Sequence, residues 1–319
     1  MHVTVIVPVF NEEKLVEQFY SRVKSAIAHI RSHSFTLLFV NDGSTDSSLE
    51  KLKNLALRDT AVRIVDFSRN FGHQAAIFAG IQHSQGEAAV IIDGDLQDPP
   101  EVIPQMIKKW EQGFEVVYGK RISREGESAF KRFTAFLFYR LMRVLSDTDV
   151  PKDVGDFRLI DRKVIDVLKT HSERNIFMRG LISWIGFRQT FVEYERDRRY
   201  AGDTKYSLIR MLNFALDGIT SFSIKPLRLS LMTGFVCILI GVALVIYTLV
   251  MKYVYPETVI SGWTSLFIAV IFFGGVQLFT MGIVGEYVGK IYRETKQRPL
   301  YIVRGTYGFR GDEEKNPSE

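Results

Sequence analysis

The stretch VIIDGDLQDPPE, residues 90–101, takes an apolar run directly into three aspartates and a double proline. A run rich in β-branched residues favours a buried strand, while unpaired charges are costly to bury. The prolines favour the start of a helix, because proline is tolerated at the first helical position. We therefore expect a buried strand that ends at a charged site and is followed by a helix.

Strand and helix patterns alternate on both sides of this stretch. Such an order predicts an α/β fold with a mostly parallel sheet that is covered by helices on both faces. The expected strands are residues 3–9, 36–40, 62–67, 88–92 and 116–118, and the expected helices are residues 12–30, 47–57, 74–83 and 100–110.

The composition indicates a chain with a sizeable core, since 46% of its 319 residues are hydrophobic and 13% are aromatic. The formal charge of +5, from 41 basic and 36 acidic residues, suits an anionic ligand or surface and does not indicate nucleic acid. Cys237 stands alone in an apolar run, which excludes a disulfide framework and a thiolate metal site. The N-terminus has the pattern of a strand rather than of a signal peptide.

Two late segments, residues 229–251 and 263–285, each run for 23 residues without a charged side chain. About 20 apolar residues suffice to cross the hydrocarbon layer, so both are expected to be transmembrane helices; a buried hairpin in a soluble protein is the alternative. Basic residues flank the pair, which predicts a multi-pass protein of the inner (plasma) membrane with a cytoplasmic catalytic domain. These residues are Lys225, Arg228, Lys290, Arg293, Lys296 and Arg298.

Polar side chains follow the expected strands at the point where each strand ends. Ligands of open parallel sheets bind outside the carboxyl ends of the strands, so we expect these side chains to line one edge. The glycine-rich turn of a dinucleotide-binding fold is replaced by PVFNEE, and the P-loop pattern is missing. The residues at the strand ends are Asn11, Glu12, Asn41, Asp42, Ser68, Arg69, Asp93 and Asp95.

Asp93 and Asp95 stand two positions apart at the end of the fourth strand. Two carboxylates at this spacing can coordinate one hard cation. Mg²⁺ or Mn²⁺ prefers oxygen ligands and keeps coordination positions for water and a diphosphate. Gln97 offers a further oxygen. The alternative is a polar loop in which an aspartate caps the next helix, and we expect Asp98 to do so.

Three motifs, VPVFNEE, VNDGSTD and DGDLQDPPE, resemble in order and spacing the nucleotide-diphospho-sugar transferase (GT-A) domain of glycosyltransferase family 2. The later DVGDFRLIDRKV and the two apolar segments are similar to the polyprenyl-phosphate glycosyltransferases, a group that includes dolichol-phosphate mannose synthase and the bactoprenol glucosyltransferases. The likeness runs from Val3 to about Arg304. Its motifs are specific for the family and much less so for the sugar.

The resemblance implies that Pro8, Glu12 and Asp42 hold the base and ribose of a nucleotide-sugar donor such as a UDP-sugar. A carboxylate can accept hydrogen bonds from uracil N–H or from a ribose hydroxyl, which fits this role. Glu12 can instead be a first-turn helix charge, and Asp42 a turn residue.

The resemblance also implies roles in catalysis. Asp93, Asp95 and Gln97 match the family's metal and diphosphate positions, and loss of Asp95 is expected to stop turnover. Asp156 matches the position of the catalytic base, with Asp153 as a competitor in the same loop. A lipid phosphate is mostly ionised at pH 7, so we expect Asp156 to position the sugar or the phosphate as much as to remove a proton.

Residues 128–146 have the pattern of a basic amphipathic helix that suits the headgroup plane of a membrane. We expect Lys131 and Arg132 to contact the lipid phosphate; packing of this helix on the domain is the alternative. Lys120 and Arg121, at the end of the fifth strand, are expected to face the donor diphosphate.

The stretch RRYAGDTKYS, residues 198–207, resembles the family's loop that closes over the donor. Arg199 and Lys205 are expected to bind the donor and to stabilise the departing diphosphate. Solvated surface charge is the alternative for both.

The expected organisation is a cytoplasmic glycosyltransferase domain in residues 1–206, a juxtamembrane amphipathic helix in 207–226, two membrane helices in 227–290 and a cytoplasmic tail in 291–319. The tail sequence RPLYIVRGTYGF has strand character on both sides of a glycine turn, which predicts a strand pair. A free pair is marginal alone, so we expect it to pair with a neighbouring subunit. The resemblance implies a homotetramer.

Together these features predict a metal-dependent hexosyltransferase that transfers one sugar with inversion to polyprenyl phosphate, for lipopolysaccharide or another cell-envelope glycan. UDP-glucose and undecaprenyl phosphate are implied by resemblance; N-acetylglucosamine, mannose and aminoarabinose-type donors are alternatives. A processive polysaccharide synthase is disfavoured, because no tryptophan lies in a Q-x-x-R-W motif. The non-enzymatic alternative is a membrane scaffold or lipid-translocation partner that retains the sugar-nucleotide fold.

Overall fold

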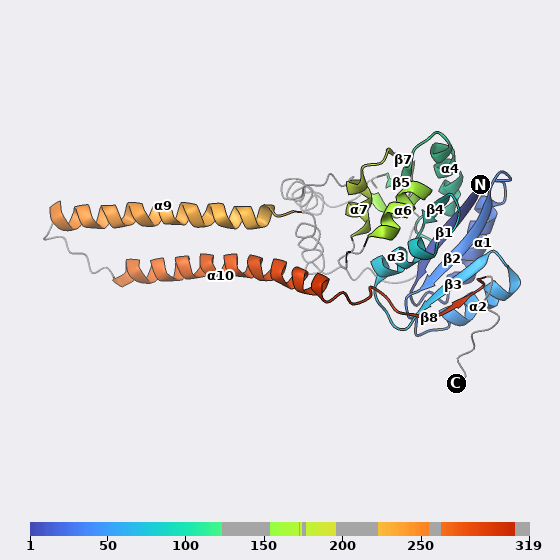
Figure 1. The fold of residues 1–319 in the computed structure, drawn as a ribbon, viewed down its shortest axis with the longest axis horizontal. Coiled ribbons are helices and arrows are strands. Elements are labelled where there is room, and N and C mark those ends of the chain that lie inside the picture. The colour runs from blue at the N-terminus through green and yellow to red at the C-terminus, as the bar shows by residue number, and fades with distance from the viewer. Residues whose placement is uncertain (123–153, 172, 174–176, 196–222, 255–262, 310–319) are drawn as a thin grey trace. The chain divides into compact units, whose positions relative to one another are not determined.

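Two compact units make up the part of the chain that the structure describes (Figure 1). One unit is an α/β domain, which contains the described residues up to 195 together with residues 298–309. The other contains two long helices within residues 223–297. The computed structural model describes residues 1–122, 154–171, 173, 177–195, 223–254 and 263–309.

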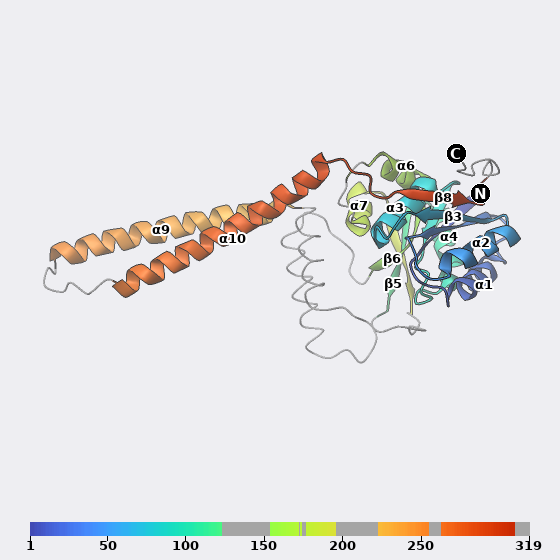
Figure 2. The same cartoon turned by 90° about the horizontal axis from the view of Figure 1, so that it is seen from below.

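An eight-stranded sheet forms the centre of the α/β unit (Figures 1 and 2). Its strands are β1 (His2–Val9), β2 (Ser34–Asn41), β3 (Val62–Phe67), β4 (Ala88–Ile91), β5 (Val116–Arg121), β6 (Val154–Asp161), β7 (Gln189–Tyr194) and β8 (Val303–Tyr307). The strand order is β7-β5-β6-β4-β1-β2-β3-β8. β1 is parallel to β2 and β4, β2 to β3, and β5 to β7, while β6 runs antiparallel to β4 and β5. The predicted, mostly parallel sheet is therefore confirmed.

One face of the sheet is covered by α1 (Val16–Ile27), α2 (Ser48–Arg58) and α4 (Ile103–Glu111). Successive side chains of a strand point to opposite faces, so Val3, Val5 and Val7 of β1 all pack on this side. Phe19 of α1 packs there too, edge to face with a ring of β2. Residues 13–15 form a turn, so α1 begins later than the sequence predicted.

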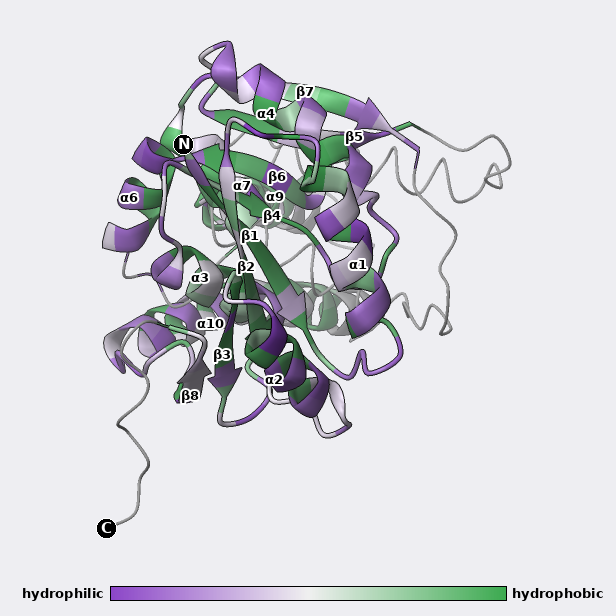
Figure 3. Cartoon of the chain, turned by 90° about the vertical axis from the view of Figure 1, so that its right-hand side faces the viewer, coloured by the Kyte–Doolittle hydropathy of each residue, from purple (hydrophilic) through white to green (hydrophobic). Residues whose placement is uncertain are grey.

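The opposite face is covered by α3 (His73–His83), α6 (Arg162–Thr170) and α7 (Met178–Ile185). Ile6 of β1 packs on this side, where it lies so close to α3 that a Cβ at Gly80 would come within 2.2 Å of it. Figure 3 colours the strands mostly as hydrophobic and much of the helix surface as hydrophilic. As predicted, helices cover both faces of the sheet, so that only its edges and the ends of its strands remain accessible to ligands.

The tail differs from its predicted strand pair. β8 is a single strand, and Gly305 lies inside it rather than at a turn. It pairs antiparallel with β3 of the same chain, with Asp66 opposite Gly305. The side of β8 that faces β3 thus finds its partners within its own domain. β8 is the last strand of the described sheet, so pairing of its outer side with a neighbouring subunit stays a prediction.

The second unit contains α9 (Lys225–Val254) and α10 (Trp263–Thr295), which contact each other. Within them, Lys225–Tyr247 and Ala269–Thr295 are long and apolar enough to cross a membrane. Most of their described large hydrophobic side chains are exposed, which disfavours the buried-hairpin alternative. Both predicted spans are therefore helical and are candidates for membrane helices.

Candidate active site

A pocket of about 300 Å³ lies at the carboxyl edge of the parallel strands. The ends of β1, β2 and β4 contribute to it, together with the loop before α3 and the first turn of that helix. This is the edge at which open parallel sheets bind ligands. Five predicted residues line the pocket, Pro8, Glu12, Asp42, Asp93 and Asp95, together with Phe10, Asn70, Gly72 and His73.

The loop after β1 is tied to the loop after β2. Asn11 adopts a left-handed backbone conformation, and its Oδ1 accepts a hydrogen bond from the backbone of Thr45 at 2.8 Å. The backbone N–H of Glu12 donates to Oγ of Ser48 at 2.9 Å. These contacts fix the chain direction at Glu12, on the wall of the pocket.

Asp42 holds the loop that follows β3. Its Oδ1 accepts a hydrogen bond from the backbone of Phe71 at 2.7 Å, and its Oδ2 accepts one from Gly72 at 3.0 Å. Burial raises the pKa of Asp42, although these two hydrogen bonds oppose the rise. The next residue, Gly43, packs so closely that a Cβ would lie 2.3 Å from the carbonyl carbon of Arg69. Asp42 therefore shapes the pocket as well as lining it.

Residues 93–98, which follow β4, form an acidic loop that carries the predicted metal residues. Oδ1 of Asp95 accepts a hydrogen bond from the backbone of Gln97 at 3.1 Å, and the intervening Leu96 has a positive φ of 60°. The side chain of Asp93 is 24% exposed. Burial raises the pKa of Asp93 to about 6, with His73 opposing the rise and Asp156 adding to it.

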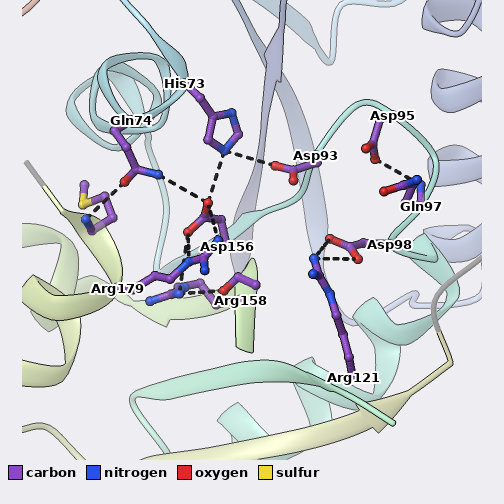
Figure 4. Close-up of polar contacts among 12 residues, drawn as sticks. His73, Gln74, Asp93, Asp95, Gln97, Asp98, Arg121, Asp156, Arg158 and Arg179 are labelled. Carbon is purple, nitrogen blue, oxygen red and sulfur yellow. Dashed lines mark hydrogen bonds and ion pairs between the residues drawn. The ribbon is translucent and has the colours of Figure 1, made fainter. Parts of the chain in front are cut away.

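Asp156 of β6 lies among cationic side chains (Figure 4). Arg179 of α7 donates from Nε to Oδ1 at 2.8 Å and from Nη2 to Oδ2 at 3.2 Å, and Arg158 lies 4.0 Å from Oδ1. Burial alone raises the pKa of Asp156, but the hydrogen bonds from His73 and Arg179 outweigh it and hold the pKa well below its ordinary value. The carboxylate is thus ionised, oriented and a weak base.

His73 and Gln74, at the start of α3, connect this carboxylate to its surroundings (Figure 4). Nε2 of His73 lies 3.3 Å from Oδ2 of Asp156 and 3.4 Å from Oδ1 of Asp93. Burial lowers the pKa of His73, but the hydrogen bond to Asp156 and the charge of Asp93 more than offset it, so the pKa is raised. Gln74 donates to Asp156 at 3.3 Å and accepts from the backbone of Met178 at 3.1 Å.

Asp98 does not cap the next helix, contrary to the prediction. The short 3₁₀-helix η1 (Pro100–Val102) has Pro99 at its N-cap position and no side-chain cap. Asp98 is instead buried and accepts a hydrogen bond from the hydroxyl of Tyr194 at 2.5 Å, with Nη2 of Arg121 at 3.4 Å. A buried carboxylate needs such partners, so burial rather than helix capping decides its role.

Arg121 and Lys120 point away from each other, as neighbours in a strand do. Arg121 contacts the acidic loop through Asp98 (Figure 4). Nζ of Lys120 pairs with Oε1 of Glu193 at 2.7 Å and lies 4.5 Å from the ring centroid of Phe191. Of these two predicted donor-binding residues, the structure brings only Arg121 towards the acidic loop.

The pocket residues fit a divalent cation that is shared with a bound ligand. Oδ1 of Asp93 is buried and accepts no hydrogen bond from any residue that the structure describes, although it faces His73. Asp95 lines the same pocket. Within the described ranges, no three histidine, cysteine or acidic side chains form a ready-made metal cluster. A cation held here would therefore keep open positions, which suits Mg²⁺ or Mn²⁺ with a diphosphate.

Several predicted contacts lie outside the described residues. These are Lys131 and Arg132 with the amphipathic segment 128–146, Asp153, Arg199 and Lys205 with their loop, and most of the juxtamembrane segment 207–226.

Sequence reasoning missed His73, Gln74 and Arg179. The first two begin the helix that follows Ser68 and Arg69, so a pattern that includes helix starts as well as strand ends would mark them. Arg179 lies in α7, away from any strand end of the parallel sheet, so no local pattern marks it.

Two family models match the chain. The model described as Glycosyl transferase family 2 matches residues 4–168, and the model described as GtrB C-terminal hairpin matches residues 225–291. The first match contains most of β1 and all of β2 to β6, with the five predicted residues that line the pocket, and the second contains α9 and most of α10.

Relatives match the chain over nearly its full length. The uncharacterized glycosyltransferase YkcC of Bacillus subtilis (strain 168) is 50% identical over 306 residues, which are 96% of this chain and 94% of that protein. The bactoprenol glucosyl transferase of Shigella phage SfV is 41% identical over 308 residues, 95% of this chain and 98% of that protein.

A solved structure shares the fold. The mannosyltransferase PcManGT from Pyrobaculum calidifontis, in complex with GDP-Man and Mn²⁺, is 14% identical, with a TM-score of 0.51 over 93% of this chain and 88% of that chain. At this identity the likeness concerns the fold alone, which is GT-A-like as predicted.

Proposed function

This chain belongs to glycosyltransferase family 2, and from that premise we propose that it transfers one sugar from a nucleotide donor to a polyprenyl phosphate. The observation that carries the proposal is an acidic pocket at the carboxyl edge of the sheet in a chain that also has two candidate membrane helices. The match to the GtrB hairpin and the names of the bactoprenol glucosyl transferase relatives support a lipid phosphate acceptor.

The donor would lie in the pocket, with its base and ribose near Pro8, Glu12 and Asp42. Asp93 and Asp95, with Gln97, would hold a Mg²⁺ or Mn²⁺ ion, whose charge offsets the negative charge that develops on the leaving nucleoside diphosphate.

Basic side chains would assist around the donor and the acceptor. Arg121 is close enough to the acidic loop to favour the diphosphate, whereas Lys120 is engaged by Glu193 and is the weaker candidate. Arg199 and Lys205 are proposed to bind the donor, and Lys131 and Arg132 the lipid phosphate, on the strength of the family resemblance.

The reaction needs little proton transfer. An oxygen of the lipid phosphate attacks the anomeric carbon in line, the bond from that carbon to the donor diphosphate breaks, and the diphosphate leaves with the electron pair, which inverts the configuration. Because the phosphate is already ionised at neutral pH, the low pKa of Asp156 is no obstacle. Asp156 would instead orient the sugar or the attacking phosphate.

UDP-glucose and undecaprenyl phosphate are the proposed substrates, and the product would be a lipid-linked monosaccharide for lipopolysaccharide or another envelope glycan. The proposed site of action is the cytoplasmic face of the inner (plasma) membrane, with both α9 and α10 as membrane helices in a homotetramer. N-acetylglucosamine, mannose and aminoarabinose-type donors are the alternatives within the same chemistry.

Membranes that contain the full chain test the proposal directly. A panel of radiolabelled nucleotide sugars is supplied with Mg²⁺ or Mn²⁺ and undecaprenyl phosphate, and the chloroform–methanol extract is counted. We expect label from UDP-glucose in the lipid phase and none with the Asp95→Asn variant. Intact donor after long incubation across the whole panel would support the non-enzymatic scaffold instead.

A further inference from the structure

The loop between β3 and α3, residues 68–72, forms one wall of the pocket. Asn70 and Gly72 line the pocket directly. From the sheet side, Asp42 binds the backbone N–H groups of Phe71 and Gly72. The shape of this wall therefore depends on what holds the other end of the loop, at Ser68.

The tail holds Ser68 by both of its backbone polar groups. Its N–H donates to the carbonyl of Ile302 at 2.9 Å. Its carbonyl accepts from Nη2 of Arg304 at 2.6 Å, across 236 positions of the sequence. A hydrogen bond from a charged guanidinium is stronger than one between neutral groups, so Arg304 is the principal contact.

Aromatic rings connect the same two segments. Tyr301 stacks on Phe67, with centroids 4.9 Å apart and an interplanar angle of 14°. Phe67 in turn meets Phe71 edge to face at 5.7 Å, and the guanidinium of Arg69 lies 4.1 Å from the Phe71 ring centroid. The tail thus contacts both the last residue of β3 and, through it, a loop residue that Asp42 binds.

We propose that tail residues 301–304 position the pocket wall for the donor, with Arg304 as a positioning residue. The tail follows the second candidate membrane helix closely, since α10 ends at Thr295 and β8 begins at Val303. The segment that follows this helix in the sequence is therefore also the segment that holds loop 68–72 in position. The effect on the donor rests on the proposed function; the effect on the loop does not.

The experiment compares Arg304→Ala with Arg298→Ala in the full-length protein, held in nanodiscs. Both changes remove one exposed arginine from the tail, but only Arg304 binds Ser68. The rate of hydrogen–deuterium exchange in a peptide spanning residues 67–73 measures how firmly the loop is held. The rates in peptides from α1 and α4 measure the stability of the rest of the domain. Initial rates at varied UDP-glucose give KM and kcat separately.

For Arg304→Ala we expect about tenfold faster exchange in 67–73, unchanged exchange in α1 and α4, and a donor KM about tenfold higher with kcat within threefold. Arg298→Ala is expected to match the wild type in every reading. Arg304→Lys, which keeps a charged donor, is expected to recover part of the protection.

Three outcomes would overturn the inference in whole or in part. Unchanged exchange in 67–73 would show that the tail does not fix the loop, and faster exchange throughout the domain would make β8 a general support of the fold. If the wild type neither binds nor transfers any nucleotide sugar while exchange in 67–73 still rises locally, the proposed function fails and the link between tail and loop stands. If the loop loosens while donor KM stays unchanged, the link to the donor is wrong.

Discussion

Arg179 binds Asp156 by two hydrogen bonds, from Nε to Oδ1 at 2.8 Å and from Nη2 to Oδ2 at 3.2 Å. The pair joins the first turn of α7 to β6. With both oxygens engaged, the carboxylate has a fixed orientation and a fixed charge. A group held in this way serves positioning better than proton removal, because a base must be free to take up a proton.

Replacing Arg179 with glutamine is expected to lower kcat about 100-fold, because Asp156 loses its main orienting contact. The melting temperature should fall as well, because the nearly buried Asp156 carboxylate loses the positive charge and the hydrogen bonds that offset the cost of its burial. Arg162→Gln is the matched control, because Arg162 forms an exposed surface pair with Asp166, and both readings should stay near those of the wild type. An Arg179→Gln enzyme with wild-type kcat would contradict the positioning role.

Asp95→Asn is expected to abolish metal-dependent nucleotide binding without unfolding the protein. The side chain of Asp95 lines the pocket, and an asparagine oxygen can still accept the hydrogen bond from the backbone of Gln97. Calorimetry with UDP in the presence of Mn²⁺, and again with a chelator, measures this. Asp166→Asn, on the surface of α6, is the control and should bind as the wild type does. Sustained product formation by Asp95→Asn would rule out its role at the metal.

The contribution of Asp156 to stability should depend on pH. Its pKa in the folded protein lies below the ordinary value of 3.8, so its stabilising effect is fully present above that pH and is lost as the pH falls further. At pH 7, Asp156→Asn is expected to lower the free energy of unfolding by about 3–5 kcal/mol, since it removes the negative charge that compensates the buried guanidinium of Arg158 and the partly buried one of Arg179. Thermal unfolding in detergent with a chelator should show the two proteins converging below pH 3.8; a difference that grows on acidification would refute this.

Gly43→Ala is expected to weaken donor binding. Gly43 has a φ of 65°, and a Cβ there would lie 2.3 Å from the backbone of Arg69, so the loop beside the pocket must shift. Gly86→Ala is a matched control, because it combines a φ of 99° with an equally close approach to His2, away from the pocket. Both variants should lose about 1–2 kcal/mol or more of stability, but only Gly43→Ala should raise the donor KM.

The proposed cytoplasmic position of the α/β unit can be tested with the single native cysteine removed. In a Cys237→Ser background, Leu57→Cys places a thiol at a side chain that is 86% exposed. In intact cells, a membrane-impermeant maleimide should label it only after permeabilisation. Glu257→Cys, in the connector between the two apolar segments, should be labelled without permeabilisation; the opposite pattern would invert the topology.

The parallel half of the fold could be read from the sequence because each of its strands is a short apolar run with polar residues at its end. β1 to β4 are such runs, and their ends meet where the architecture requires. β8 was misjudged because its partner, β3, lies more than 200 positions away, and strand character alone does not name a partner. A glycine within a strand was taken for a turn.

The candidate site was predicted where a local motif marked it. Asp93 and Asp95 follow an apolar run, and this local pattern of charge marks them in the sequence. The ion pair of Asp156 with Arg179 joins two elements, and no rule of sequence spacing predicts that they meet. Asp98 shows the opposite error. Its neighbouring prolines favoured a helix cap, but Tyr194, 96 positions away, supplies the partner that its burial requires.

Because β8 pairs with β3, the α/β unit cannot be cut from the chain at one point. A soluble fragment that stops before Lys225 would leave the outer N–H and C=O groups of β3 bare, and such an edge recruits strands from other molecules and promotes aggregation. A soluble version must therefore bring residues 298–309 with it, joined by a short linker in place of the two apolar helices.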